Sequence, residues 1–179
     1  NNYENIYLKK SITLTQFLKK EKIPTNRNYY KKSIKKFSSS IDSFYVALKK
    51  FSSISGLLKN QAGPGNLILL DILTKLPRVK NVLETGVGFG FSSSTMLPNL
   101  IKKKGLLTSV DIPYLNSTNL DYLGLFVNKS LKKKWNLIIG IDYYVLKKLL
   151  NKKKLFDLVV YDSDKSYYGR LKCYHLIWE

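Results

Sequence analysis

The chain has 179 residues, of which 44% are hydrophobic, and this fits one domain with a core of its own. Its net charge of +19 arises from 31 basic and 12 acidic residues, and the basic residues are lysines apart from Arg27, Arg78 and Arg170. Nucleic-acid-binding proteins usually rely on arginine for bidentate contacts, so the lysine bias weighs against nucleic acid as the main partner.

The composition does not indicate a secreted or membrane-spanning protein. The single cysteine, Cys173, excludes an internal disulfide framework and suits a reducing compartment. The first 33 residues are polar and lack the apolar segment of a secretory signal, and no apolar run approaches the length of a membrane span. We therefore expect a cytoplasmic protein with no membrane partner, and nothing in the sequence indicates its oligomeric state.

Residues 1–60 are predicted to form a helical extension that precedes the main domain at 61–179. Apolar residues recur at helical spacing between 40 and 51, with Ser40 as the cap, and this predicts a helix. Gly63-Pro64-Gly65 then breaks the chain. Asn66 can cap a second helix, whose leucine stripe runs from Leu67 to Leu76 before Pro77 ends it.

From residue 81 onward, short apolar runs alternate with helical patterns. We expect strands at 81–85, 105–111, 137–139 and 156–161, and helices at 92–103, 118–131, 143–150 and 167–178. Such alternation implies a parallel sheet with right-handed crossovers. The predicted fold class is therefore α/β, a Rossmann-like parallel sheet with flanking helices.

A glycine loop joins the first strand to the helix that follows it. Gly86, Gly88 and Gly90 allow tight turns and close approach of a ligand, and Ser92 to Ser94 are candidate N-caps of that helix. The dinucleotide fingerprint G-x-G-x-x-G fails, because Phe91 or Ser93 stands where its third glycine belongs. Glu84 beside the loop suits a cationic ligand, although a glycine-rich connection that binds nothing is the simpler alternative.

Acidic residues follow each of the predicted strands. Asp111 ends the second strand, where an acid can accept hydrogen bonds from both ribose hydroxyls of an adenosine ligand. Asp142 follows the third strand and would border the adenine, and Asp162 ends the fourth. Any one of these could simply cap a helix, but together they indicate a shared cationic or hydroxyl-rich ligand.

Three lysine runs, at 102–104, 132–134 and 152–154, each close a helix just before a strand. In a parallel sheet these positions fall at the edge opposite the carboxyl ends of the strands, where ligands bind. We expect the lysines to complement helix dipoles at that far edge, and a basic docking face is the alternative.

Four motifs follow one another along the chain: Val-Leu-Glu-Thr-Gly-Val-Gly-Phe-Gly, Thr-Ser-Val-Asp, Asn-Leu-Ile-Ile-Gly and Phe-Asp-Leu-Val-Val-Tyr-Asp-Ser-Asp-Lys. Together they resemble the class I S-adenosylmethionine (SAM)-dependent methyltransferases over residues 60–179. Within that class the chain is similar to the methyltransferase domain 24 group, related to the catechol and caffeoyl-CoA O-methyltransferases. The resemblance implies SAM as the cofactor. The residues that it places around SAM are Glu84, Gly86, Gly88, Gly90, Ser92, Asp111 and Asp142.

The segment after the fourth strand departs from the domain 24 pattern, because Lys165 stands where that group usually has histidine. The related catechol and caffeoyl-CoA enzymes do have Asp-x-x-Lys, in which the aspartate binds a divalent metal and the lysine acts as base. By this resemblance Asp162 and Lys165 are the candidate catalytic residues, metal dependence stays open, and the final strands of the fold are expected beyond Glu179. A structural Lys165, paired with Asp162 or Asp164, is the alternative.

Three functions therefore compete. The first is a methyltransferase acting on an oxygen of a small molecule or sugar. The second is an RNA methyltransferase, suggested by the net charge of +19. The third is a SAM-fold fragment that binds without catalysis.

Overall fold

The computed structural model describes residues 16, 19–22, 66–113, 122–152 and 155–178. The chain divides into two compact units, Asn1–Ile41 and Asp42–Glu179, and the sheet and helices below belong to the second. The helix expected at 40–51 and the break at 63–65 lie outside the described residues, so the boundary at 60/61 stays a prediction. Within the described ranges, no helix is both long and apolar enough to cross a membrane.

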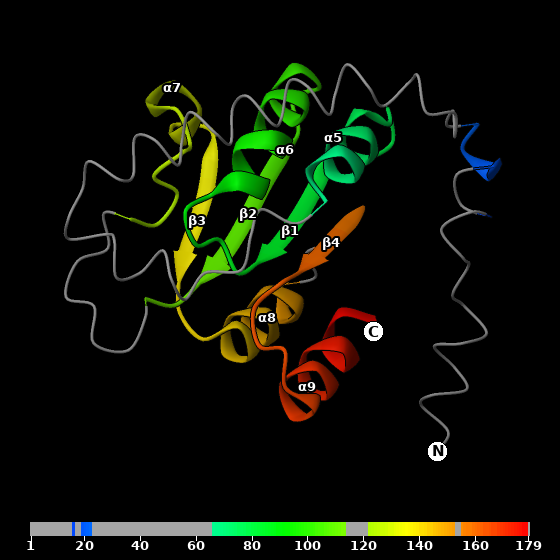
Figure 1. Ribbon diagram of the computed structural model, residues 1–179. Coiled ribbons are helices and arrows are strands. Elements are labelled where there is room, and N and C mark those ends of the chain that lie inside the picture. The colour runs from blue at the N-terminus through cyan, green and yellow to red at the C-terminus, as the bar shows by residue number, and fades with distance from the viewer. Residues whose placement is uncertain (1–15, 17–18, 23–65, 114–121, 153–154, 179) are drawn as a thin grey trace. The chain divides into compact units, whose positions relative to one another are not determined.

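Four parallel strands form the sheet, in the order β3-β2-β1-β4 (Figure 1). Their bounds are β1 Asn81–Thr85, β2 Leu106–Asp111, β3 Trp135–Ile139 and β4 Leu158–Tyr161. From β1 the chain adds β2 and then β3 on one side, and it returns to add β4 on the other side of β1. Ligands of such sheets bind at this switch point, outside the carboxyl ends of the strands. The prediction of a parallel α/β sheet is confirmed.

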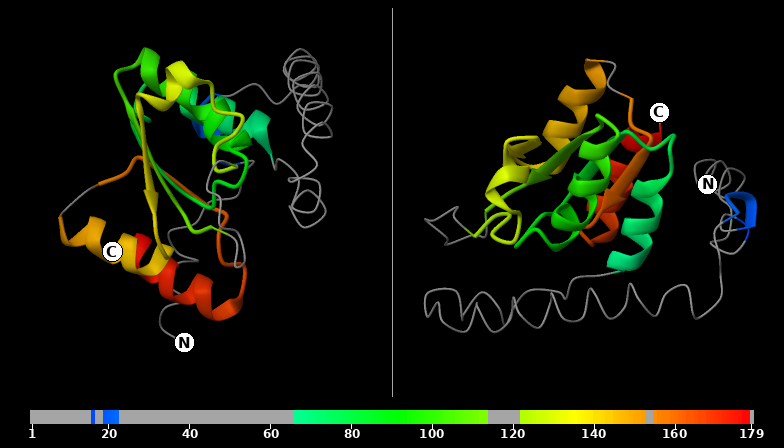
Figure 2. Two further views of the ribbon diagram at one scale, coloured as in Figure 1. Left: turned by 90° about the vertical axis from the view of Figure 1, so that its left-hand side faces the viewer. Right: turned by 90° about the horizontal axis from the view of Figure 1, so that it is seen from above.

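Helices cover both faces of the sheet (Figures 1 and 2). Their bounds are α5 Leu67–Lys75, α6 Phe91–Lys102, α7 Lys129–Lys132, α8 Asp142–Asn151 and α9 Tyr167–Trp178. On the face of α5 and α6 the core is built around Val82, Met96, Leu97, Leu100 and Leu107. On the face of α8 and α9 it is built around Leu83, Val110, Leu146, Leu149 and Cys173. Neighbouring residues of one strand thus serve opposite cores, as the pleat requires.

The first helix of this unit is encoded locally. The Asn66 Oδ1 atom accepts a hydrogen bond from the backbone N–H of Leu69, as an N-cap does. The helix ends at Lys75, just before Pro77, so the predicted cap and stop are both confirmed.

The helix expected at 118–131 is wrong over most of its described length. Residues 122–127 form turns, and only α7, capped by Asn128, is helical. Gly124 has a φ of +63°, and its N–H donates to the Gly88 carbonyl instead of to a helical partner. Phe126 similarly donates to the Phe89 carbonyl. The apolar spacing that resembled a helix is therefore a turn packed onto the glycine loop.

The described lysine runs lie at the predicted edge of the sheet. Lys104 stands two residues before β2 and Lys134 directly before β3, both at the amino ends of the strands. Lys103 donates from Nζ to the carbonyls of Thr74, Leu76 and Val79, each at 2.6 Å. Lys103 thus satisfies carbonyl groups at and after the end of α5, a different helix from α6, which the lysine run closes. The prediction that the run complements the dipole of its own helix stays a prediction.

Candidate functional site

The glycine loop leaves β1 at the centre of the carboxyl edge of the sheet. Gly86, Gly88 and Gly90 all have positive φ, at +80°, +51° and +84°. A Cβ atom on Gly86 would lie 2.5 Å from the carbonyl oxygen of Asp162, so β4 packs directly against this turn. The loop therefore needs glycine for its backbone conformation and, at Gly86, for space.

Asp111, at the end of β2, holds this loop. Its Oδ2 atom accepts hydrogen bonds from the backbone N–H groups of Val87 and Gly88, both at 2.8 Å. Its Oδ1 atom accepts from the N–H of Ile112 at 2.7 Å. A carboxylate offers about four lone-pair sites, so Asp111 keeps capacity for further donors such as ribose hydroxyls.

Glu84 lies under the loop with 0% of its surface exposed. Its carboxylate accepts hydrogen bonds from the hydroxyls of Ser92, Ser93 and Ser109, the last two at 2.6 Å. Burial raises the pKa of Glu84, and the serine hydrogen bonds oppose that rise. The Glu84 side chain thus joins β1, β2 and α6 from inside, and its place in the cofactor site stays a prediction.

The serines after the loop do not cap α6, contrary to the N-cap prediction. Gly90 is the residue that precedes the helix, in the left-handed conformation, and Phe91 is its first residue. Ser92 and Ser93 instead donate to Glu84, and Ser94 donates to the Phe91 carbonyl. A negative carboxylate at the amino end of a helix is favourable, so Glu84 takes over the electrostatic role of a cap.

The turn at 122–127 forms a wall against the far side of the loop. A Cβ atom on Gly90 would lie 2.8 Å from the Cα atom of Gly124. A Cβ atom on Gly124 would in turn lie 2.5 Å from the ring of Trp135. The rings of Phe91 and Phe126 pack in a tilted arrangement, with centroids 4.4 Å apart and planes at 50° to each other. The loop is thus packed between β4 on one side and this turn on the other.

Asp142 begins α8 and faces the segment that leaves β4. Its Oδ2 atom accepts a hydrogen bond from the Ser163 hydroxyl at 2.5 Å, and the Tyr161 hydroxyl lies 3.3 Å away. The Ser163 hydroxyl is also 3.0 Å from Oγ1 of Thr85, at the end of β1. Burial raises the pKa of Tyr161, which keeps its hydroxyl protonated as a donor. Asp142 is therefore tied to the ends of both β1 and β4.

Asp162 and Lys165 form an ion pair at the same edge. The Lys165 Nζ atom lies 2.9 Å from Asp162 Oδ1, and the two side chains are 53% and 59% exposed. The pair is in water rather than in the core, so it adds little to stability. Its geometry matches the structural alternative for Lys165 and leaves the ammonium accessible to an acceptor.

Sequence reasoning missed three residues that organise this edge. The motif that contains Ser109 assigns it no role, yet its hydroxyl donates a hydrogen bond to Glu84 and accepts one from Trp135. A serine in an otherwise apolar buried strand was the available signal, because buried polar groups need partners. Ser163 and Gly124 act through long-range contacts that no local pattern indicates.

The carboxyl edge thus combines a rigid glycine loop with the carboxylates of Asp111, Asp142 and Asp162. Such an edge can accept hydrogen bonds from hydroxyls and can attract a cation. The described residues include no group of three His, Cys, Asp or Glu side chains able to hold a metal ion, and metal dependence stays open.

Comparison with known proteins agrees with this geometry. A family model described as O-methyltransferase matches residues 36–177. No curated protein matches the chain in sequence. Among solved structures, an O-methyltransferase from Bacillus cereus in complex with S-adenosylhomocysteine (SAH) is 15% identical, with a TM-score of 0.54. The match covers 91% of this chain and 65% of that one.

A methyltransferase from Podospora anserina, also bound to SAH, is 16% identical with a TM-score of 0.55. The match covers 84% of this chain and 64% of that chain. At these identities the structural likeness establishes the fold. The chain spans about two thirds of the length of these relatives or slightly less.

Proposed function

Because the chain belongs to the O-methyltransferase family, we propose that it transfers a methyl group from SAM to an oxygen of a small molecule, sugars included. The relatives from Bacillus cereus and Podospora anserina were both solved with SAH, the product left by SAM after methyl transfer. This supports SAM as the cofactor.

The observation that carries the proposal is the clamp between Asp111 and the glycine loop. The two hydrogen bonds at 2.8 Å place a carboxylate, the loop backbone and the end of β2 at one point of the carboxyl edge. An adenosine ligand needs an acceptor for its ribose hydroxyls beside a loop without side chains. Asp111 and Gly86, Gly88 and Gly90 meet that need.

The remaining residues are assigned by their positions around this clamp. Asp142 borders the adenine, and Ser163 holds its carboxylate in place. Ser92 lies in the first turn of α6 and donates a hydrogen bond to Glu84, which supports the loop from beneath. A ligand that carries positive charge is favoured here, because Asp111 ends β2 and Asp142 and Asp162 come soon after the ends of β3 and β4, all at one edge of the sheet.

SAM supplies a methyl group on a sulfonium, which needs no covalent intermediate with the protein. The chain must therefore align the acceptor hydroxyl and remove its proton. We propose that Lys165, as a neutral amine, accepts this proton and becomes an ammonium, which then pairs with Asp162 at the carboxyl edge.

Calorimetry with SAM and SAH tests the cofactor assignment. Asp111→Asn keeps an oxygen for the loop N–H groups but loses the charge, and we expect its affinity for SAH to fall about tenfold or more. Asp157→Asn is the matched control, because Asp157 also accepts two backbone N–H bonds but at the opposite edge. Equal affinity in both variants removes Asp111 from the ribose role.

NAD, titrated in the same experiment, should not bind, because the third dinucleotide glycine is replaced by Phe91 or Ser93. Transfer of a labelled methyl group from SAM to catechol, to a monosaccharide and to an RNA oligonucleotide then separates the acceptor classes. Methylation of the RNA alone would favour the alternative of an RNA methyltransferase. Cofactor binding without transfer to any of them would favour a binding domain without catalysis.

A further inference from the structure

The segment that joins β4 to α9 carries both candidate catalytic residues, Asp162 and Lys165. Their ion pair is in water, so it does not by itself fix the segment to the body of the protein. Of residues 162–166, only Ser163 has a partly buried side chain, and the other four are exposed. The side chain that can hold this segment against the sheet is therefore that of Ser163.

The Ser163 hydroxyl contacts two elements of the carboxyl edge at once. It donates to Oδ2 of Asp142, the first residue of α8, at 2.5 Å. It also lies 3.0 Å from the hydroxyl oxygen of Thr85, which ends β1 and is fully buried. Asp142 is itself held, because its Oδ1 atom accepts from the N–H of Tyr143 at 2.7 Å. Hydrogen bonds to a carboxylate are stronger than those between neutral groups, so Ser163 ties the segment firmly to α8 and β1.

The backbone of the segment lies against the glycine loop. The N–H of Asp162 donates to the Thr85 carbonyl at 2.8 Å, so the chain follows β1 for one residue beyond β4. A Cβ atom on Gly86 would lie 3.0 Å from the backbone nitrogen of Ser163. The loop proposed to bind SAM and the segment that carries Lys165 are therefore in direct contact, and Ser163 lies at that contact.

Ser163 is not needed to begin α9, because Ser166 caps that helix. The Ser166 hydroxyl accepts from the N–H of Gly169 at 3.0 Å, as an N-cap side chain does. The Ser166 carbonyl accepts from the N–H of Arg170 at 3.1 Å, which is the first bond of the helix. The contacts of Ser163 therefore serve the placement of the segment and not the start of α9.

We propose that Ser163 is a positioning residue: through Asp142 and Thr85 it holds the segment 162–165 so that Lys165 lies beside the cofactor loop. This inference rests on the proposed function, which assigns the acceptor proton to Lys165, and it adds the residue through which that base is placed. Proton transfer depends on distance and alignment, so a displaced base lowers turnover more than it lowers cofactor binding.

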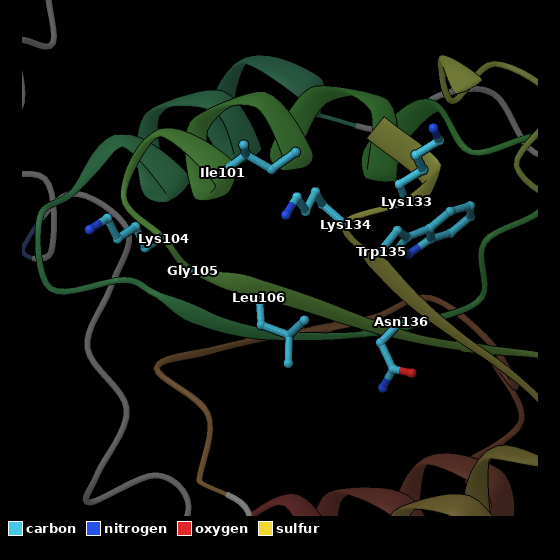
Figure 3. A pocket seen from close by; sticks show the side chains of 8 residues that line it. All are labelled: Ile101, Lys104, Gly105, Leu106, Lys133, Lys134, Trp135 and Asn136. Atoms are coloured by element: carbon cyan, nitrogen blue, oxygen red, sulfur yellow. The ribbon is translucent and has the colours of Figure 1, made fainter. Parts of the chain in front are cut away.

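Two variants of Ser163 and two controls test this role. Ser163→Ala removes the hydroxyl, and Ser163→Thr keeps it. Ser166→Ala removes the cap of α9 from the same segment. Asn136→Ala removes a hydrogen bond to Oγ1 of Thr108 at the opposite edge of the sheet. Asn136 lies there among the residues that line a pocket between the end of α6 and the beginnings of β2 and β3 (Figure 3).

Hydrogen exchange at the Asp162 amide, followed by NMR, measures the anchor without any turnover. Ser163→Ala should speed this exchange by at least about fivefold, which corresponds to the loss of one net hydrogen bond. Ser163→Thr should restore the rate, and both controls should stay within about twofold of the wild type. Unchanged exchange in Ser163→Ala would overturn the proposal. Equal acceleration at the amides of β2 would also overturn it, because the effect would then be a general loss of stability.

The contact with Asp142 can be tested separately by a double-variant cycle. Adding Ser163→Ala to Asp142→Ala should speed exchange at Asp162 by no more than about twofold, because the shared hydrogen bond is already lost. Effects that multiply in full would show that Ser163 acts without Asp142 and would contradict the proposed link.

Methyl transfer to the catechol, monosaccharide or RNA that the wild type methylates tests the consequence for turnover. Ser163→Ala should lower kcat about tenfold to a hundredfold while the KM of the acceptor and the affinity for SAH stay within about threefold, and Ser163→Thr should recover most of the loss. A raised KM with unchanged kcat would overturn the positioning role. A wild type that binds no SAH contradicts the proposed function, whereas wild-type exchange and turnover in Ser163→Ala contradict this inference alone.

Discussion

The Oδ2 atom of Asp111 accepts a hydrogen bond from the backbone N–H of Gly88 at 2.8 Å, across 23 positions of sequence. The same carboxylate is the proposed acceptor of the ribose hydroxyls. Loop conformation and ligand recognition are therefore coupled through one side chain, and substitutions at Asp111 can separate the two roles.

Asp111→Ala should lower the free energy of unfolding by about 1–3 kcal/mol, because the N–H groups of Val87 and Gly88 lose their shared acceptor. Asp111→Asn should lower it less, since an amide oxygen remains. Urea unfolding measures both. Asp162→Ala, an exposed carboxylate at the same edge, should change the value by less than about 1 kcal/mol. Equal losses for the alanine and asparagine variants would show that charge, not the acceptor, holds the loop.

Gly86→Ala should destabilise the protein by about 2 kcal/mol or more and should remove SAH binding. The φ of +80° costs alanine roughly 1–2 kcal/mol, and its Cβ would lie 2.5 Å from the Asp162 carbonyl oxygen. Gly140→Ala is the control, because its Cβ would meet only the side chain of Val145, at 2.9 Å. Thermal unfolding measures the stability of both variants, and calorimetry measures their affinity for SAH. Equal effects at the two positions would argue against a specific role for Gly86.

Gly88→Val should also abolish SAH binding, because a branched side chain at a φ of +51° forces the loop to move.

Glu84 should make stability fall as pH rises. Burial raises its pKa in the folded state above the ordinary 4.5, so the folded protein holds this proton more tightly than the unfolded chain. The free energy of unfolding then decreases from pH 4.5 up to the folded pKa and is level beyond it. Glu84→Gln should remove this decrease, as measured by urea unfolding from pH 4.5 to 7.5.

Asp157 provides a control of opposite sign. Backbone hydrogen bonds, first that from Asn81, lower the pKa of Asp157. Its contribution is therefore present above the ordinary value of 3.8 and is lost as pH falls through the folded pKa. Asp157→Asn should leave the profile between pH 4.5 and 7.5 unchanged. A Glu84→Gln profile identical to the wild type would contradict the assigned burial effect.

Lys103→Met should cost about 2 kcal/mol, while Lys102→Met should stay within about 0.5 kcal/mol. Both substitutions keep an unbranched side chain, shorter by one heavy atom, and remove one charge. Lys103 alone places its ammonium among three carbonyls, and Lys102 is exposed. The melting temperatures of the two variants show whether Lys103 stabilises the protein through its carbonyl contacts. Identical melting temperatures would show that the Lys103 charge, like that of Lys102, contributes no more than a charge in solvent.

The elements that could be predicted from sequence are those encoded by neighbouring residues. Val82 and Leu83, followed by glycine, specify a buried strand, and Asn66 and Pro77 bound α5 by cap and stop. The parallel order follows because each crossover contains a helix. Gly86, Gly88 and Asp111 could be placed at one edge on the same grounds, since strand ends in a parallel sheet share an edge.

What sequence could not predict depends on distant partners. The turn at 122–127 has helical spacing, but its N–H groups bond the glycine loop more than thirty positions away. Ser92 and Ser93 have cap chemistry, but a buried carboxylate competes for their hydroxyls. In both cases a long-range polar contact overrides a local preference, and no short window of sequence contains both partners.

Gly90, Gly124 and Trp135 contact one another in series, and this limits which substitutions the three positions can tolerate together. Gly90 and Gly124 are each restricted by backbone conformation and by space, whereas Trp135 is restricted by space alone. Gly124→Ala should therefore be harmful beside tryptophan and less harmful after Trp135→Leu, which is pairwise epistasis between a turn and a strand. Sequences that share this arrangement should show correlated substitutions at the two positions, with the larger side chain always on β3.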